Sequence, residues 1–134
     1  MGDALAKCVD DLLKGAPKPN GKVQLKYTEK KVKLPTPTMI GMQGTSVLGL
    51  LEVNGNKMFC APGEPCAELG LELKKRYPGS WVLGLANDHL GYFLTEDEYQ
   101  KGGYERKVSF YGPKMGPWLV EQLSEMAKPA QPQK

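Results

Sequence analysis

Two short segments bring together side chains that could transfer protons or bind a metal ion. Residues 61–65, Ala-Pro-Gly-Glu-Pro, hold one carboxylate between two prolines. Residues 86–92, Ala-Asn-Asp-His-Leu-Gly-Tyr, hold an amide, a carboxylate, the only imidazole of the chain and a phenol. Carboxylates and imidazoles serve both as general acids or bases and as metal ligands. We therefore take Glu64, Asp88, His89 and Tyr92 as candidate site residues.

Each candidate also has a structural interpretation. Glu64 precedes a predicted helix, so its carboxylate could cap that helix, whose N-terminal partial charge favours the ionised form. His89 alone is typical of a solvent-facing loop residue, and Tyr92 alone of a packed aromatic. Cys60 and Cys66 flank Glu64, but their separation of six residues is not one of the common zinc spacings.

Other motifs of enzyme chemistry are absent from the sequence. It contains no G-x-S-x-G, H-E-x-x-H, P-loop or G-x-G-x-x-G pattern. With one histidine, the chain cannot form a His-rich zinc site by itself.

Hydrophobic periodicity predicts helices and strands in the first half of the chain, which position these segments. Apolar residues at helical spacing predict a helix over 4–14, with Asp3 as its N-cap and Gly15 as its stop. Alternation predicts a strand at 23–27, followed by a bulge or a second short strand near 28–31. After a long Pro- and Gly-containing connection, Asn54-Gly55 predicts a β-hairpin between strands 46–53 and 57–61.

The second half alternates helices and strands. We expect a helix from Cys66 to Tyr77 with Pro65 in its first turn, followed by a buried strand over 81–86. Thr95 and Glu98 form a capping box that predicts a short helix. A strand over 105–111 and a last helix opened by Pro117 complete the order. Each candidate segment then follows the end of a strand, where α/β sheets collect functional groups. The order predicts an α/β layered domain with a mixed β-sheet flanked by helices. It would be a single domain over 1–128 with a disordered tail, 129–134.

Composition narrows the class of protein. The 134 residues are 40% hydrophobic with a net charge of +3, which is typical of one globular domain and gives no support for nucleic-acid binding. We interpret the lysines of 22–33 as the solvent face of an amphipathic strand, with an anionic partner or membrane surface as the alternative.

The sequence also predicts where the protein resides. It has no run of about 18 apolar residues that could span a membrane. Asp3 stands where a signal peptide needs basic residues, and three cysteines are an odd number that favours reduced thiols. We therefore expect a cytoplasmic protein.

Several motifs resemble one enzyme family. The stretches FCAPGEPCAELGLELKK from Phe59 and GLANDHLGYFLTEDEYQKGGYERKVSFYG from Gly84 are similar to the C-terminal part of the catalytic domain in the neutral/alkaline non-lysosomal ceramidases. The Gly-Glu-Pro turn, the Leu-Ala-Asn loop, the Gly-Tyr pair before Thr95 and the Gly-Tyr-Glu run at 103–105 follow the family's order. The resemblance covers about residues 46–112 well and the first predicted helix more loosely.

The resemblance implies a zinc amidohydrolase that cleaves the N-acyl bond of ceramide. In that family two histidines from the N-terminal region, one glutamate and one tyrosine bind zinc, and the glutamate and tyrosine fall on Glu64 and Tyr92. The histidine ligands and the catalytic serine have no counterpart in this sequence, and His89 is not at a ligand position. The resemblance therefore implies half a zinc site, which would hold zinc only if a partner chain supplied the missing ligands.

Three functional hypotheses follow. The chain could be the C-terminal portion of a ceramidase-like hydrolase for lipid amides, inactive alone and completed by an N-terminal half or by another copy. It could be a non-catalytic binding or interaction domain that kept the fold. It could also be an enzyme in its own right, with Asp88, His89 and Tyr92 as acid–base groups. An exposed apolar face would favour the first hypothesis over the second.

Overall fold

The structure is a computed structural model that describes residues 2–17 and 21–128. The predicted disordered tail, 129–134, and part of the predicted connector after the first helix lie outside the described residues. The elements in chain order are α1 (Gly2–Gly15), β1 (Leu25–Lys33), β2 (Thr45–Val53), β3 (Asn56–Cys60), β4 (Glu64–Pro65), α2 (Ala67–Arg76), β5 (Trp81–Leu83), β6 (Tyr92–Phe93), α3 (Glu96–Lys101), α4 (Tyr104–Lys107) and α5 (Met115–Ala127).

A four-stranded mixed sheet in the order β1-β2-β3-β5 forms one layer of the fold. β1, β2 and β3 are antiparallel neighbours, whereas β5 joins β3 in parallel. The predicted hairpin is confirmed, because Asn54 and Gly55 turn the chain with positive φ angles of 49° and 84°. β4 and β6 form a second, two-stranded parallel sheet. The predicted α/β layered class with a mixed sheet and flanking helices is confirmed.

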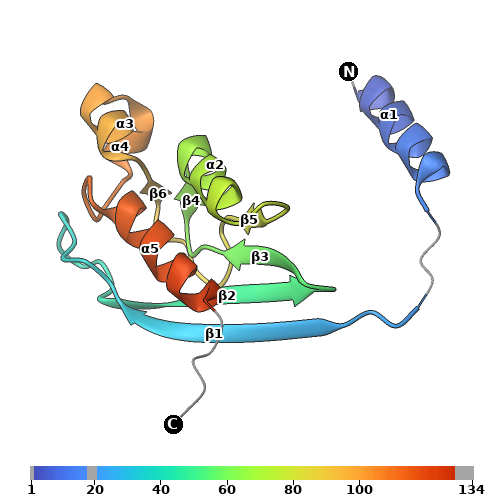
Figure 1. Cartoon of the computed structure of the whole chain (residues 1–134). Coiled ribbons are helices and arrows are strands. Elements are labelled where there is room, and N and C mark those ends of the chain that lie inside the picture. The colour runs from blue at the N-terminus through green and yellow to red at the C-terminus, as the bar shows by residue number, and fades with distance from the viewer. Residues whose placement is uncertain (1, 18–20, 129–134) are drawn as a thin grey trace, which may run out of the picture.

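The core lies between the sheet and helices α2 and α5, which cover one of its faces (Figure 1). Its largest fully buried side chains include Leu48, Phe59, Leu69, Leu73, Phe93, Leu119 and Leu123. The opposite face of the sheet carries no helix within the part of the chain that the structure describes (Figure 1). Helix α1 stands apart from this body, and none of its residues is buried.

Strand β1 corrects two predictions. Its pairing with β2 runs without interruption from Leu25↔Val53 to Lys33↔Thr45, so the predicted bulge near 28–31 is wrong. The lysines were expected on the solvent face, yet Lys30 points to the helix side, where its Nζ lies 2.7 Å from Oε2 of Glu125. The apolar side chains of β1 change faces along the strand: Val32 is buried under the helices, whereas Leu25 and Tyr27 are exposed on the other face. That change of face produced the apparent slip in register.

Four further boundaries differ from the predictions. Residues 104–107 form a helix, not a strand, and only Ser109 forms a bridge, to Gly91. β5 is only three residues long and exposes Trp81, so it is not a buried strand. The last helix begins at Met115, two residues before Pro117, and Pro65 lies in β4 rather than in α2. The remaining elements, including the Thr95-capped helix α3, are confirmed. The first helix is also confirmed, but it runs from Gly2 to Gly15, so Asp3 lies in its first turn and is not its N-cap.

Among the helices of the described residues, none has the length and apolar character needed to cross a membrane.

Candidate functional site

The two candidate segments lie side by side because the sheet ends in a second, smaller ladder. β3 and β5 are parallel neighbours, so the loops that follow them leave the sheet at the same end. These loops continue into β4 and β6, which pair in parallel with Glu64 opposite Tyr92 and Pro65 opposite Phe93. Register partners project to the same face of a ladder. The carboxylate and the phenol named from the sequence are therefore direct cross-strand neighbours.

Backbone hydrogen bonds fix this arrangement. The Glu64 N–H donates to the carbonyl of Gly91 at 2.9 Å, and the Leu90 N–H donates to the carbonyl of Pro62 at 2.8 Å. The Leu85 N–H donates to the carbonyl of Gly63 at 2.8 Å. The loops around Glu64 and His89 thus form one hydrogen-bonded unit, and neither can move far without the other.

Two glycines make this close approach possible. A Cβ on Gly63 would lie 2.5 Å from the carbonyl oxygen of Gly91 and 2.9 Å from the ring of Phe93. Gly91 has a φ of +80°, and a Cβ there would lie 2.2 Å from the carbonyl oxygen of Val108. Neither contact is sterically possible, so both positions require glycine.

The side chains of Glu64, His89 and Tyr92 meet at the surface of this unit. His89 Nε2 lies 3.9 Å from Oε1 of Glu64, with the histidine side chain 71% and the glutamate side chain 39% exposed. The Glu64 carboxylate beside it raises the pKa of the Tyr92 phenol above its ordinary value, with a smaller contribution from desolvation. The Tyr92 ring packs edge-on against Tyr104, with ring centroids 6.1 Å apart. The predicted helix-capping role for Glu64 is wrong, because Glu64 belongs to β4 and Cys66 is the N-cap of α2.

Asp88 has different partners. Its Oδ2 accepts hydrogen bonds from the side chains of Gln43 and Ser46, the latter at 3.0 Å, and its Oδ1 accepts one from the His89 backbone N–H at 3.2 Å. This carboxylate ties the loop to the start of β2. Two residues of the same loop, Leu85 and Asn87, have positive φ angles of 55° and 76°. Such strained residues persist where surrounding structure holds them and cluster at functional sites.

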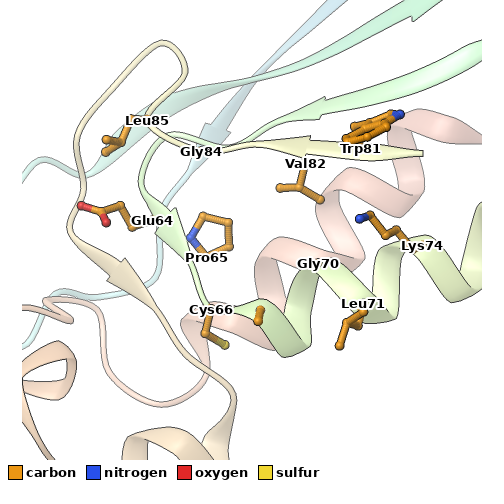
Figure 2. A pocket seen from close by; sticks show the side chains of 11 residues that line it. Glu64, Pro65, Cys66, Gly70, Leu71, Lys74, Trp81, Val82, Gly84 and Leu85 are labelled. Carbon is orange, nitrogen blue, oxygen red and sulfur yellow. The ribbon is translucent and has the colours of Figure 1, made fainter. Parts of the chain in front are cut away.

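A cavity of about 520 Å³ opens next to Glu64. It lies between α2 and β5, with Glu64 and Leu85 at one end and Trp81 and Lys74 at the other (Figure 2). Lys74 Nζ lies 5.2 Å from the centre of the Trp81 ring. The sequence did not mark Leu71, Lys74 or Trp81 as site residues, because only the pairing of β5 beside α2 brings them to Glu64.

Two thiols, those of Cys60 and Cys66, lie near the site. Burial raises the pKa of both Cys60 and Cys66, which favours the neutral thiol over the thiolate that binds metals. Across residues 2–17 and 21–128, no group of three or more His, Cys, Asp or Glu side chains could hold a metal ion. The donor set at this site is therefore the Glu64 carboxylate and the Tyr92 phenol, with the His89 imidazole beside them.

These oxygen donors fit part of a zinc site. A carboxylate and a phenolate are hard ligands that zinc accepts, and Glu64 and Tyr92 are register partners in the β4–β6 ladder. A closed zinc site has four protein ligands and an open catalytic site has three. Glu64 and Tyr92 would supply two such ligands.

Comparisons with known proteins define the fold class. No protein-family model matches the chain, and no curated protein matches it in sequence. Solved structures do match, and they give the chain a ceramidase-like fold.

The matching structures include the neutral ceramidase from Pseudomonas aeruginosa. It superimposes on 63% of this chain with a TM-score of 0.56 and 20% sequence identity. A structure described as ceramidase complexed with C2 matches the same share with a TM-score of 0.55 and 20% identity. The chain spans only 15% and 14% of the lengths of these two proteins.

Proposed function

We propose that this chain is the C-terminal portion of a ceramidase-like zinc amidohydrolase and contributes Glu64 and Tyr92 as two of its four zinc ligands. The observation that carries the proposal is the register of β4 and β6, which places these two side chains opposite each other. Their backbone is fixed by the hydrogen bonds of the two loops. A site whose ligands are held before the metal binds loses less ordering entropy on binding.

The ceramidase-like fold supports the proposed reaction class, the hydrolysis of an N-acyl amide. Zinc, when bound, would supply a water of lowered pKa and polarise the amide carbonyl. Glu64 and Tyr92 would hold the ion from the β4–β6 side, and a separate N-terminal region would supply the two histidines. Because Glu64 and Tyr92 are only half of that ligand set, we expect the chain to be inactive alone. His89 Nε2 lies 3.9 Å from the Glu64 carboxylate, beyond hydrogen-bond distance, and is not one of the proposed ligands.

Complementation tests this proposal. The chain is mixed with the N-terminal portion of the Pseudomonas aeruginosa neutral ceramidase, and zinc content and hydrolysis of a fluorogenic short-chain ceramide are measured. We expect hydrolysis only in the mixture. Removing one zinc ligand leaves an incomplete set, so Glu64→Gln should lower the restored rate at least about 100-fold, and Tyr92→Phe should lower zinc content.

The matched control is Glu68→Gln, which removes the same charge from an exposed carboxylate in the first turn of α2. It should leave the restored rate within about twofold. Full hydrolysis by the Glu64→Gln mixture, or hydrolysis by the chain alone, would show that the proposal is wrong.

A second function, a non-catalytic binding domain, is supported by the cavity between α2 and β5. Its volume of about 520 Å³ falls within the range of small-molecule pockets. Its lining combines apolar side chains with one cation, Lys74, and one anion, Glu64. Tight binding of a lipid amide that survives Glu64→Gln and Tyr92→Phe but is lost in Trp81→Ala would favour this function over hydrolysis.

A further inference from the structure

The face of the main sheet that carries no helix is apolar at one end. The cross-strand partners Tyr27, Leu51, Met58 and Trp81 form one continuous row across all four strands. Alternate residues of the same strands add Leu25, Val53 and Leu83 to the same face. We call this side of the sheet the open face and these seven residues its apolar patch. Leu25, Tyr27, Trp81 and Leu83 are 68%, 48%, 59% and 40% exposed.

The side chains of the open face change from apolar to charged along the strands. Its most apolar end lies where β1 begins, at Leu25 and Val53. Toward the other end of β1, the same face carries Glu29, Lys31 and Lys33. The loops with Glu64 and Tyr92 follow the ends of β3 and β5, which lie at that charged end. The apolar patch therefore begins next to the N-terminal segment. Its other side adjoins the candidate site, because the Asn87 side-chain amide donates to the Tyr27 hydroxyl at 3.3 Å and Trp81 also lines the cavity beside Glu64.

Helix α1 carries a matching apolar surface. Leu5, Cys8, Val9, Leu12 and Leu13 follow helical spacing and form one stripe. Leu5, Leu12 and Leu13 are 68%, 73% and 67% exposed, and no residue of Gly2–Gly15 is buried. The opposite side of α1 is charged, with Lys7 and Lys14 both paired to Asp11. An isolated helix of about 12–15 residues is only marginally stable in water, so α1 needs a partner surface.

The connection between the two surfaces is long enough to let them meet. Residues 16–24 join α1 to β1, and nine residues can span up to about 30 Å. Four strands are about 15 Å across, so this segment can return α1 over the whole open face. Tethering on this scale gives an effective concentration on the order of millimolar, well above that of a second copy in dilute solution.

We propose that α1 folds back onto the open face of its own chain, with its apolar stripe on the row formed by Tyr27, Leu51, Met58 and Trp81. Docking turns the two-layer fold into three layers with the sheet in the middle. The charged side of α1 then faces solvent, as in other surface helices. Because Trp81 also lines the cavity beside Glu64, a docked α1 would contact the rim of that cavity.

Cys8 reports on this contact, because it lies in the apolar stripe. We expect iodoacetamide to alkylate Cys8 about tenfold more slowly in the wild-type chain than in Leu12→Asp, as a docked population of about 90% would produce. The matched control is Lys14→Ala, which makes the same change in net charge on the charged side of α1. Its Cys8 should stay as protected as in the wild type. Equal alkylation rates in the wild type and Leu12→Asp would overturn the proposal.

A disulfide test locates the contact. In Met58→Cys, mild oxidation should join positions 8 and 58, whereas in Glu121→Cys, with position 121 exposed on α5, positions 8 and 121 should not be joined. Oxidising a mixture of unlabelled and ¹⁵N-labelled chains distinguishes the possible occupants. Disulfide-linked peptides of a single isotope support docking within one chain. Mixed-isotope peptides would assign the face to a second copy and overturn the proposal, and so would the absence of the 8–58 bond in chains that retain native circular dichroism.

Discussion

At the scale of single residues, Gly63 determines whether the two candidate loops can touch. We predict that Gly63→Ala lowers the free energy of unfolding by about 1–3 kcal/mol, because its Cβ would overlap the Gly91 carbonyl and the Phe93 ring. Urea denaturation measures this loss. Gly44→Ala is the matched control, since a Cβ on Gly44 would have no atom within 4 Å, and it should change the free energy by less than about 0.5 kcal/mol. Equal losses in the two variants would contradict the proposed loop contact.

Which residues would form the site was only partly predictable. The strand-to-loop transitions and the clustered polar residues pointed to Glu64, Asp88, His89 and Tyr92. Their pairing was not predictable, because β4 and β6 are two residues long and leave no periodicity in the sequence. Asp88 illustrates the limit: its residue type suits catalysis, yet its carboxylate is bound to Gln43 and Ser46, which lie more than 40 positions earlier in the chain.

At the scale of elements, hydrophobic patterns succeeded where one face of an element is buried. Helices α2 and α5 and the hairpin β2–β3 follow such patterns, and each packs into the core. The pattern of β1 was ambiguous because both of its faces carry apolar residues. Leu25 and Tyr27 lie on one face, and Val32 lies on the other. Residues 105–111 also look like a strand, but the turn at Gly102 and Gly103, both with positive φ, starts a short helix there.

One ion-pair group joins three strands of the sheet and makes stability depend on pH. Oε1 of Glu52 in β2 lies 3.1 Å from Nζ of Lys26 in β1, and its Oε2 lies 3.5 Å from Nζ of Lys57 in β3. The pKa of the Glu52 carboxyl lies below its ordinary value, mainly because the Lys26 ammonium is hydrogen-bonded to this carboxylate. The nearby positive charge of Lys57 lowers the pKa further. A carboxyl group whose pKa is lower in the folded state than in the unfolded state stabilises the fold when the pH is above the unfolded-state pKa. This contribution to the free energy of unfolding is lost as the pH falls through the folded-state pKa.

We therefore expect Glu52→Gln to lower the melting temperature at neutral pH and to have a smaller effect in acid, where the wild-type carboxyl is protonated. Differential scanning calorimetry at pH 7 and at about pH 3 measures the difference. Glu29→Gln on the exposed face of β1 is the control, with the same charge change. A deficit in Glu52→Gln that grew with acidification would have the wrong sign and would exclude this role for Glu52.

At the scale of the whole molecule, the two ends of the sheet carry different kinds of surface. The end after β3 and β5 carries Glu64 and Tyr92, the two ligands of the proposed zinc site. The end where β1 begins carries the apolar patch of the open face. If α1 covers that patch, the chain alone can be monomeric.

This division predicts the association state. Exposed apolar patches of this kind promote self-association. We expect multi-angle light scattering to give the mass of one chain, 14.7 kDa, for the wild type over a wide concentration range. Leu12→Asp weakens the helix that covers the patch, so its mean mass should rise with concentration, whereas Lys14→Ala, with the same change in net charge, should stay monomeric. A wild type that dimerises, with Leu12→Asp monomeric, would mean that α1 joins two chains rather than protecting one.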